Sequence, residues 1–170
     1  MTTDSLSRTV ATPGRDTQPG VGSPIPARFQ ERPMITRVLL ADDHPIVREG
    51  LRTVLQRRPG CEVVGEASDG IDALKKAESL HPNVMILDVT MPKLNGLEVC
   101  RLARQRIPDL EVLFVTQHDS AQMMREALAA GAKGYVVKSN AARDLLDAIE
   151  RVSQHQVFTA LATRDPDARD

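Results

Sequence analysis

Acidic side chains stand directly after two apolar runs of this sequence. Asp42 and Asp43 follow the apolar residues 38–41 of a predicted strand at 35–41, and Asp88 follows the run 84–87. An apolar run that stops at an acid is typical of a buried parallel strand that delivers a polar side chain to the edge of a sheet. Carboxylates gathered at one edge repel one another, so they either raise one another's proton affinity or bind a hard divalent cation.

Two further apolar runs end in a hydroxyl and an amine. Thr116 follows the run 111–115, and Lys138 follows the run 134–137. An aspartate carboxylate can attack phosphorus to give an acyl phosphate, while a lysine and a threonine hydroxyl can stabilise the transferring phosphoryl group. Mg²⁺ suits the acids because it prefers oxygen ligands and keeps several of its waters. The four strand ends together therefore predict phosphoryl chemistry at Asp88.

The elements that would position these residues follow from the spacing of apolar side chains. Strands are expected at about 35–41, 62–67, 83–88, 111–115 and 134–137, and helices at about 44–58, 71–80, 96–105, 119–130 and 141–153, the last one capped by Ser139 or Asn140. The first two helices are assigned apolar stripes consisting of Ile46, Val47, Leu51, Val54 and Leu55, and of Ile71, Ala73, Leu74, Ala77 and Leu80.

Strands that alternate with helices predict an α/β protein whose parallel sheet is covered on both faces. The fold expected is a flavodoxin-like (βα)5 doubly wound sheet with strand order 2-1-3-4-5. In that order the first and third strands are neighbours, so Asp42 and Asp43 would face Asp88 at the point where the strand order reverses.

The ends of the chain differ in composition from its centre. Residues 1–33 mix Thr, Ser, Pro, Gly and Arg without periodicity, which predicts a disordered N-terminal extension. Met34 directly precedes the first strand, and we hypothesise that it is an alternative translation start, which the intact mass of the native protein would decide. A single domain is expected at 34–154. Residues 155–170 contain one apolar patch, Val157, Phe158 and Leu161, and are interpreted as a linker-like tail without an output domain.

Composition limits the classes of partner. The formal net charge of −1 gives no basic footprint for nucleic acid. No stretch approaches the roughly 18 apolar residues of a membrane span, so a cytoplasmic protein without membrane contact is expected. Cys61 and Cys100 lie far apart in sequence, which favours free thiols. The first helix carries a basic face that either meets an acidic partner or is solvated: Arg48, Arg52, Arg57 and Arg58.

The motifs taken together resemble the receiver domain of two-component response regulators. The residues that carry the resemblance are Leu40-Ala41-Asp42-Asp43-His44, Leu87-Asp88-Val89-Thr90-Met91-Pro92 with Gly96, Val115-Thr116, and Gly131-Ala132-Lys133-Gly134-Tyr135-Val136-Val137-Lys138. They span about 35–153. Asp42-Asp43-His44-Pro45 and Ser139 are similar to the NarL/FixJ branch, whose receivers normally precede a LuxR-type helix-turn-helix that is absent from this chain.

The resemblance implies a role for each of these residues. Asp88 would accept phosphate from a sensor histidine kinase, assisted by Lys138, and Thr116 and Tyr135 would act as the switch. Mg²⁺ would be held by Asp42, Asp43, Asp88 and the backbone carbonyl of Thr90. The domain would be a signalling module and no enzyme beyond its own phosphorylation and dephosphorylation. The switched surface would comprise the fourth helix, the fifth strand and the last helix. It would serve a downstream protein partner or a homodimer, without direct DNA binding by this chain.

Two residues depart from the pattern of the family. Gln117 stands where a small residue is usual and would crowd the site, and His118 would tune the access of water. Three functions are therefore compared: a phosphorylation-controlled receiver, alone or as part of a DNA-binding transcription regulator, a phosphorylation-independent interaction module, and a metal phosphohydrolase. The third function is disfavoured, because phosphatases with an aspartate nucleophile use a second aspartate two residues later, and this chain has Thr90 at that position.

Each site residue also has a plainer interpretation when it is taken alone. Asp42 and Asp43 resemble a helix cap with a solvated acid, Lys138 a surface lysine, Thr116 a strand-end hydroxyl and Tyr135 a packing residue. Their joint occurrence at the ends of four predicted strands favours a single site. The four histidines, His44, His81, His118 and His155, are interpreted as solvated or capping residues and not as metal ligands.

Overall fold

The computed structural model describes residues 34–161, so the predictions for 1–33 and 162–170 lie outside the described residues. The strands are β1 (Thr36–Ala41), β2 (Cys61–Ala67), β3 (Val84–Leu87), β4 (Glu111–Thr116), β5 (Gly134–Val137) and β6 (Phe158–Ala160). The helices are α1 (Pro45–Gln56), α2 (Gly70–Leu80), α3 (Gly96–Arg106), α4 (Ala121–Ala129) and α5 (Ala141–Ser153), with a 3₁₀ turn, η2 (Lys138–Asn140), before α5.

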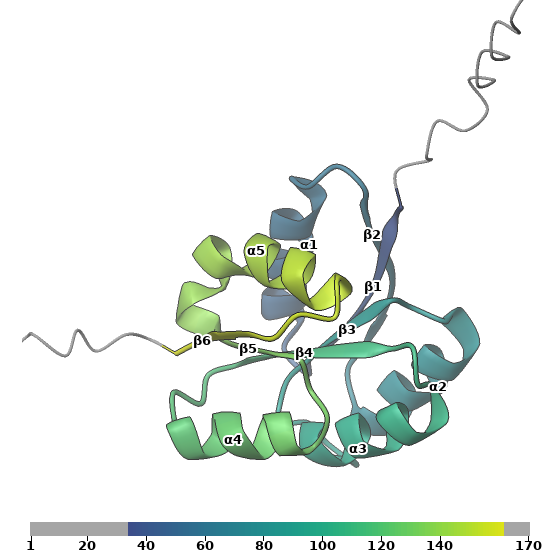
Figure 1. Cartoon of the computed structure of the whole chain (residues 1–170). Helices are drawn as coiled ribbons and strands as arrows, with labels where there is room; N and C mark the ends of the chain where they lie inside the picture. Colours follow the sequence, from purple (N-terminus) through teal and green to yellow (C-terminus); the bar gives the residue numbers. More distant parts are fainter. Residues whose placement is uncertain (1–33, 162–170) are drawn as a thin grey trace, which may run out of the picture. The chain divides into compact units, whose positions relative to one another are not determined.

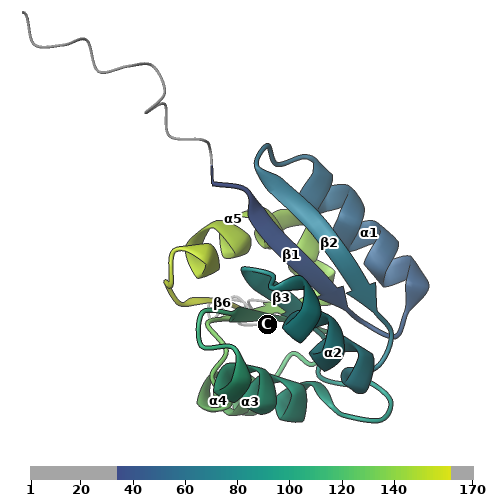
Figure 2. The same ribbon diagram turned by 90° about the vertical axis from the view of Figure 1, so that its right-hand side faces the viewer.

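The six strands form one sheet in the order β2-β1-β3-β4-β5-β6, and every pair is parallel. Helices α1 and α5 cover one face, and α2, α3 and α4 cover the other (Figure 1). The view turned by 90° shows the same two layers on either side of the strands (Figure 2). The predicted flavodoxin-like fold and the order 2-1-3-4-5 are confirmed, with one further strand at the edge.

The core is divided by the sheet into two layers. Alternate side chains of β3 enter opposite layers, with Met85 and Leu87 in one and Val84 and Ile86 in the other. Because both faces are covered by helices, all four positions of this strand are buried. Both cysteines are free thiols, and since Cys61 and Cys100 lie against different layers, the sheet separates them.

Strand β6 is the element that the sequence did not predict. It pairs with β5 through the partners Gly134 with Phe158, Tyr135 with Thr159 and Val136 with Ala160. The Phe158 amide donates to the Lys133 carbonyl at 2.9 Å, and the Arg151 guanidinium lies 5.7 Å from the centre of the Phe158 ring. Ordered structure therefore continues beyond residue 154, into the segment interpreted as a tail.

Several details of the helices differ from the predictions. Ile46 and Ile71 are 83% and 41% exposed, so neither belongs to the core stripe assigned to it. Helix α4 begins later than expected, with Ser120 as its N-cap, whose hydroxyl accepts from the Met123 amide at 3.1 Å. Asn140 precedes α5 but makes no side-chain cap. Within residues 34–161 none of the helices has the length and apolar character needed to cross a bilayer.

Candidate functional site

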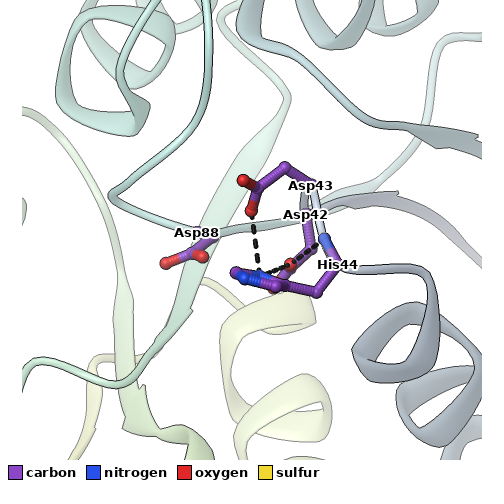
Figure 3. A group of neighbouring side chains, drawn as sticks. All are labelled: Asp42, Asp43, His44 and Asp88. Atoms are coloured by element: carbon purple, nitrogen blue, oxygen red, sulfur yellow. Dashed lines mark hydrogen bonds and ion pairs between the residues drawn. The ribbon is translucent and has the colours of Figure 1, made fainter.

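The carboxyl ends of four neighbouring strands bring the predicted site residues to one edge of the sheet. Leu87 pairs with Ala41, and the Asp88 amide donates to the Ala41 carbonyl at 3.0 Å, so Asp88 lies beside the residues that follow β1. Candidate ligand atoms of Asp42, Asp43, His44 and Asp88 all lie within 4.8 Å of one another (Figure 3). The three predicted acids therefore meet, as the strand order requires.

Lys138 connects two of these acids. Its Nζ lies 2.7 Å from Asp42 Oδ2 and 2.9 Å from Asp88 Oδ2, and each aspartate is only 2% exposed. Burial alone would lower the pKa of Lys138, but its hydrogen bonds to both carboxylates and their negative charges outweigh burial and raise the pKa above its ordinary value. The ammonium group is thus held charged between two buried carboxylates.

His44 occupies the mouth of the acidic cluster. Its backbone amide donates to Asp42 Oδ1 at 2.8 Å. Its ring Nδ1 lies 3.1 Å from Asp42 Oδ1 and 3.0 Å from Asp43 Oδ1, and the side chain is 55% exposed. The sequence interpretation placed His44 among solvated or capping residues, and it stands at the N-cap position of α1, without a side-chain cap bond. The ring is indeed open to solvent on one side, but on the other it contacts both acids, because the chain turns sharply between β1 and α1.

The acidic cluster fits a hard cation. Asp42 Oδ2 and Asp43 Oδ1 are buried oxygens without a hydrogen bond of good geometry among the described residues, although a cationic or ring nitrogen approaches each of them. Carboxylate oxygens are the ligands that Mg²⁺ prefers, and among the described residues the three clustered carboxylates have one lysine ammonium to balance their charge. The donor set is therefore suitable for Mg²⁺.

The loop after β3 is folded tightly against Asp88. The Gly96 amide donates to the Val89 carbonyl at 2.7 Å, and a Cβ on Gly96 would collide with the Asp88 carbonyl. Only glycine fits at this close approach. The loop places Thr90 at the exposed edge of the site, where its amide lies 3.4 Å from Asp88 Oδ1.

His118 forms contacts with three residues around the site. Its Nε2 lies 3.0 Å from Thr90 Oγ1, its amide donates to Thr116 Oγ1 at 3.4 Å, and its carbonyl accepts from the Tyr135 hydroxyl at 2.6 Å. The sequence singled out His118 but gave no sign of these bonds, because Thr90 and Tyr135 come from other segments of the chain. His118 therefore connects the loop after β3 with the end of β4 and with β5, while its neighbour Gln117 is exposed.

The aromatic ring of Tyr135 is already inside the protein. Its residue exposure is 0%, and its ring lies 6.5 Å from that of Phe114. Burial, with smaller contributions from the negative charges of Asp119 and Asp88, raises the pKa of Tyr135 to about 12. Thr116 is also fully buried. The two predicted switch residues thus come from the neighbouring strands β4 and β5 and share His118 as a hydrogen-bond partner.

The predicted basic face of the first helix is largely paired within the chain. Arg48 Nε lies 3.2 Å from Glu66 Oε2, and Arg52 Nε lies 2.7 Å from Glu66 Oε1. Arg58 Nη1 lies 3.8 Å from Glu150 Oε2 and donates to the Leu146 carbonyl at 3.0 Å. These three arginines therefore have acidic partners within the chain, which differs from both predicted alternatives, a solvated face and a face that binds an acidic partner.

Comparison with known proteins identifies the family. Residues 38–150 match the response regulator receiver domain. The chain is 37% identical to the transcriptional regulatory protein DegU of Brevibacillus brevis over 118 residues, which are 69% of this chain and 50% of that protein. It is 41% identical to the DNA-binding transcriptional activator DevR/DosR of Mycobacterium tuberculosis over 118 residues, 69% of this chain and 54% of that protein. The chain thus spans about half the length of these curated relatives.

A solved structure agrees with these sequence matches. The crystal structure of a two-component response regulator of the LuxR family from Aurantimonas sp. SI85-9A1 superimposes with a TM-score of 0.69 at 38% identity, covering 72% of this chain and 87% of that one. The matched range contains all the strand ends that form the acidic cluster. On sequence, fold and the position of its site, the chain belongs to the response regulator receiver domain family.

Proposed function

We propose that Asp88 accepts a phosphoryl group from a phosphohistidine of a sensor kinase. The observation that carries this proposal is the position of its carboxylate at the carboxyl end of β3, 2% exposed, 2.9 Å from Lys138 Nζ and beside Asp42 and Asp43. A carboxylate in such surroundings is held in one orientation and is shielded from bulk water. Both conditions favour a nucleophile that must attack in line.

The proposed transfer exchanges one bond to phosphorus for another. An oxygen of the Asp88 carboxylate forms a bond to phosphorus as the N–P bond of the phosphohistidine breaks. The bonding electron pair stays on the imidazole nitrogen, which then takes up a proton. Lys138, released from its ion pair with the free carboxylate, would neutralise the phosphoryl oxygens. Later attack by water on phosphorus would return the carboxylate and give inorganic phosphate.

The proposed Mg²⁺ ligands are the carboxylates of Asp42, Asp43 and Asp88 and the backbone carbonyl of Thr90. The clustering of these three acids, whose candidate ligand atoms lie within 4.8 Å of one another, supports this assignment. Bound Mg²⁺ would neutralise negative charge on the transferring phosphoryl group. The acids would orient their oxygens toward one point, and His44 would cover the open side of that point.

The proposed switch runs from Asp88 through Thr116 and His118 to Tyr135. A phosphoryl group on Asp88 adds negative charge next to the Thr116 hydroxyl, which would turn to donate to it. That movement would disturb the hydrogen bond from the His118 amide to the Thr116 hydroxyl. The His118 carbonyl, which accepts from the Tyr135 hydroxyl, would shift as a result. The surface of α4, β5 and α5 would change as a result. Gln117 and His118 would modulate the rate at which phosphate enters and leaves.

The proposed setting is a cytoplasmic two-component system that regulates transcription. Support comes from the matched relatives, which are named as transcriptional regulators and of which this chain covers about half. A sensor kinase would be the upstream partner, and a homodimer or a downstream protein would receive the signal. In this proposal the receiver comprises residues 34–154 together with β6.

The test is the intact mass of the wild-type chain and of Asp88→Asn after exposure to a small phosphodonor, with and without Mg²⁺. A phosphate adduct that needs Mg²⁺ and is absent from Asp88→Asn is expected. Rapid quenching over a series of times controls for hydrolysis. No adduct at any time, in a folded chain that still binds Mg²⁺, would favour a phosphorylation-independent interaction module instead.

A further inference from the structure

Arg48 makes a contact that no other arginine of the described chain makes with the acidic turn. Its Nη1 donates to the backbone carbonyl of Asp42 at 2.5 Å, while its own amide donates to the His44 carbonyl at 3.1 Å. The side chain is only 16% exposed. The amide bond is the ordinary helical bond of the first turn of α1, so the specific contribution of Arg48 to the turn between β1 and α1 is the side-chain bond to Asp42.

The other end of the guanidinium is anchored on β2. Arg48 Nε lies 3.2 Å from Glu66 Oε2, and Glu66 is paired with Leu40 in the parallel ladder of β1 and β2. Glu66 is itself fixed by Arg52 and by the Lys76 ammonium, which donates to its backbone carbonyl. The guanidinium thus extends from a rigid strand to the carbonyl of the first predicted metal ligand.

We propose that Arg48 is a positioning residue for the Mg²⁺ site. By holding the Asp42 carbonyl, it fixes the backbone so that the carboxylates of Asp42 and Asp43 converge beside Asp88 before a cation arrives. This inference rests on the proposed function and names the residue that preorganises its metal site. Without Arg48, part of the ordering would have to occur on cation binding, which weakens affinity.

A simple charge effect would act in the opposite direction. Removing a positive group near three carboxylates strengthens their attraction for a cation, so a purely electrostatic role predicts tighter Mg²⁺ binding in Arg48→Met. Glu66 already compensates the guanidinium, which makes this electrostatic effect small. The sign of the change in affinity therefore separates positioning from charge.

Arg52 provides the matched control. It also pairs with Glu66 from α1, one helical turn further on, but its described contacts include none with the acidic turn. Arg52→Met removes the same chemical group from the same partner. Arg48→Lys is the second control, because a lysine keeps the charge but cannot bridge Glu66 and the Asp42 carbonyl with a planar fork.

The experiment measures the rise in Tm of the full chain as Mg²⁺ is added, and compares the Mg²⁺ concentrations that give the same rise in each variant, because the stabilisation depends on the ratio of Mg²⁺ concentration to Kd. Arg48→Met and Arg48→Lys are expected to need about 10-fold more Mg²⁺ than the wild type. Arg52→Met is expected to stay within about twofold, as a half-exposed pair contributes little. The Tm without Mg²⁺ reports whether each variant folds.

Phosphorylation provides a second readout that a merely structural role would not produce. At saturating Mg²⁺ the Arg48→Met chain should reach the wild-type rate of phosphate uptake, because the reacting groups are unchanged, while Asp88→Asn should take up none. Unchanged or tighter Mg²⁺ binding in Arg48→Met, or an equal loss in Arg52→Met, would overturn the positioning role. A wild-type chain that fails to bind Mg²⁺ at all would instead overturn the proposed function.

Discussion

Buried acids lie at both ends of the sheet, but their surroundings differ. Asp42 and Asp88 lie at the carboxyl ends of their strands, whereas Glu111 lies at the amino end of β4. All three residues are at most 4% exposed. Glu111 Oε1 lies 2.6 Å from His155 Nδ1, and Oε2 lies 3.4 Å from Arg104 Nη1. At the carboxyl edge, by contrast, two buried carboxylate oxygens have no hydrogen bond of good geometry among the described residues.

This difference separates a structural buried charge from a functional one. The Glu111 cluster joins α3, β4 and His155, the second residue after α5, and both of its carboxylate oxygens form hydrogen bonds, one to Arg104 and one to His155. It can therefore serve stability alone. At the carboxyl ends of the strands, three clustered carboxylates share one lysine ammonium and one imidazole among the described residues, so their negative charge is only partly balanced. An incomplete set of partners therefore marks the site more clearly than burial does.

Replacing the basic side chain that contacts each group of buried acids tests this distinction and should have the largest effect on stability. Lys138→Met leaves Asp42 and Asp88 without their shared ammonium group and should lower the free energy of unfolding by about 3 kcal/mol in Mg²⁺-free buffer. Arg104→Met, at the other edge, should lower it by about 2 kcal/mol. Urea unfolding with and without Mg²⁺ gives both values.

Added Mg²⁺ should affect the two variants differently. The deficit of Lys138→Met relative to the wild type should shrink as Mg²⁺ replaces the lost positive charge. The deficit of Arg104→Met should remain, since within residues 34–161 Glu111 belongs to no cluster of ligand side chains that could hold a metal ion. If Mg²⁺ reduced both deficits equally, the two edges would not differ in the way proposed here.

Neutralising the structural acid should change stability without changing function. Glu111→Gln keeps the volume of the side chain but weakens its bonds to Arg104 and His155, with an expected loss of about 1–2 kcal/mol. The Mg²⁺ dependence of phosphate uptake should be the same as in the wild type. A shift in the Mg²⁺ concentration at half-maximal uptake would show that Glu111 influences the Mg²⁺ site at the other end of the strands.

The ionisation of Tyr135 gives the smallest effect and the most local one. The chain has one tyrosine and no tryptophan, so phenolate absorbance reports Tyr135 alone. Its pKa is raised from 10.0 to about 12. Because the folded state favours the neutral phenol, its contribution to stability is complete below pH 10 and is lost as the pH rises from 10 toward 12.

The same titration tests whether the pKa of Tyr135 depends on the charge of Asp88 or on that of Glu111. Asp88→Asn removes one of the negative charges that raise the pKa of Tyr135, so the absorbance midpoint should fall by a fraction of a unit. Glu111→Gln should leave the midpoint where it is in the wild type. A native midpoint near 10 in the wild-type chain would show instead that the ring is exposed.

The sequence predicted the sheet well because its central strands are buried on both faces. β3, β4 and β5 are continuous apolar runs that end at a polar residue, and this pattern has few alternatives when helices lie between the runs. The meeting of Asp42, Asp43, Asp88 and Lys138 followed from the strand order alone. Their individual roles stay predictions.

Two errors in the predicted core could have been avoided with helix geometry. Ile46 and Ile71 each lie roughly 130° around their helix from the centre of the other apolar residues assigned to the same stripe. Counting apolar residues placed them in the core, whereas their angular position points to solvent, as observed. Both residues are at the start of a helix, where one apolar residue can precede the stripe.

Other features had no local signal. β6 is three residues long and contains Phe158, Thr159 and Ala160, too short for the alternation that marks a strand. The contact of Arg48 with Glu66 and the bonds of His118 depend on residues from separate elements. Such contacts depend on the packing of the folded chain, and a single sequence does not specify them.

Strand β6 also determines how safely this domain can be shortened. Gly134–Val137 is an apolar strand that is buried along its length, and β6 occupies the side of it that faces away from β4. A fragment cut at residue 154 would open that edge and offer it to another molecule as a template for intermolecular pairing. A fragment that ends at residue 161 keeps the edge covered. Resistance to aggregation in this receiver therefore depends in part on three residues that carry none of its chemistry.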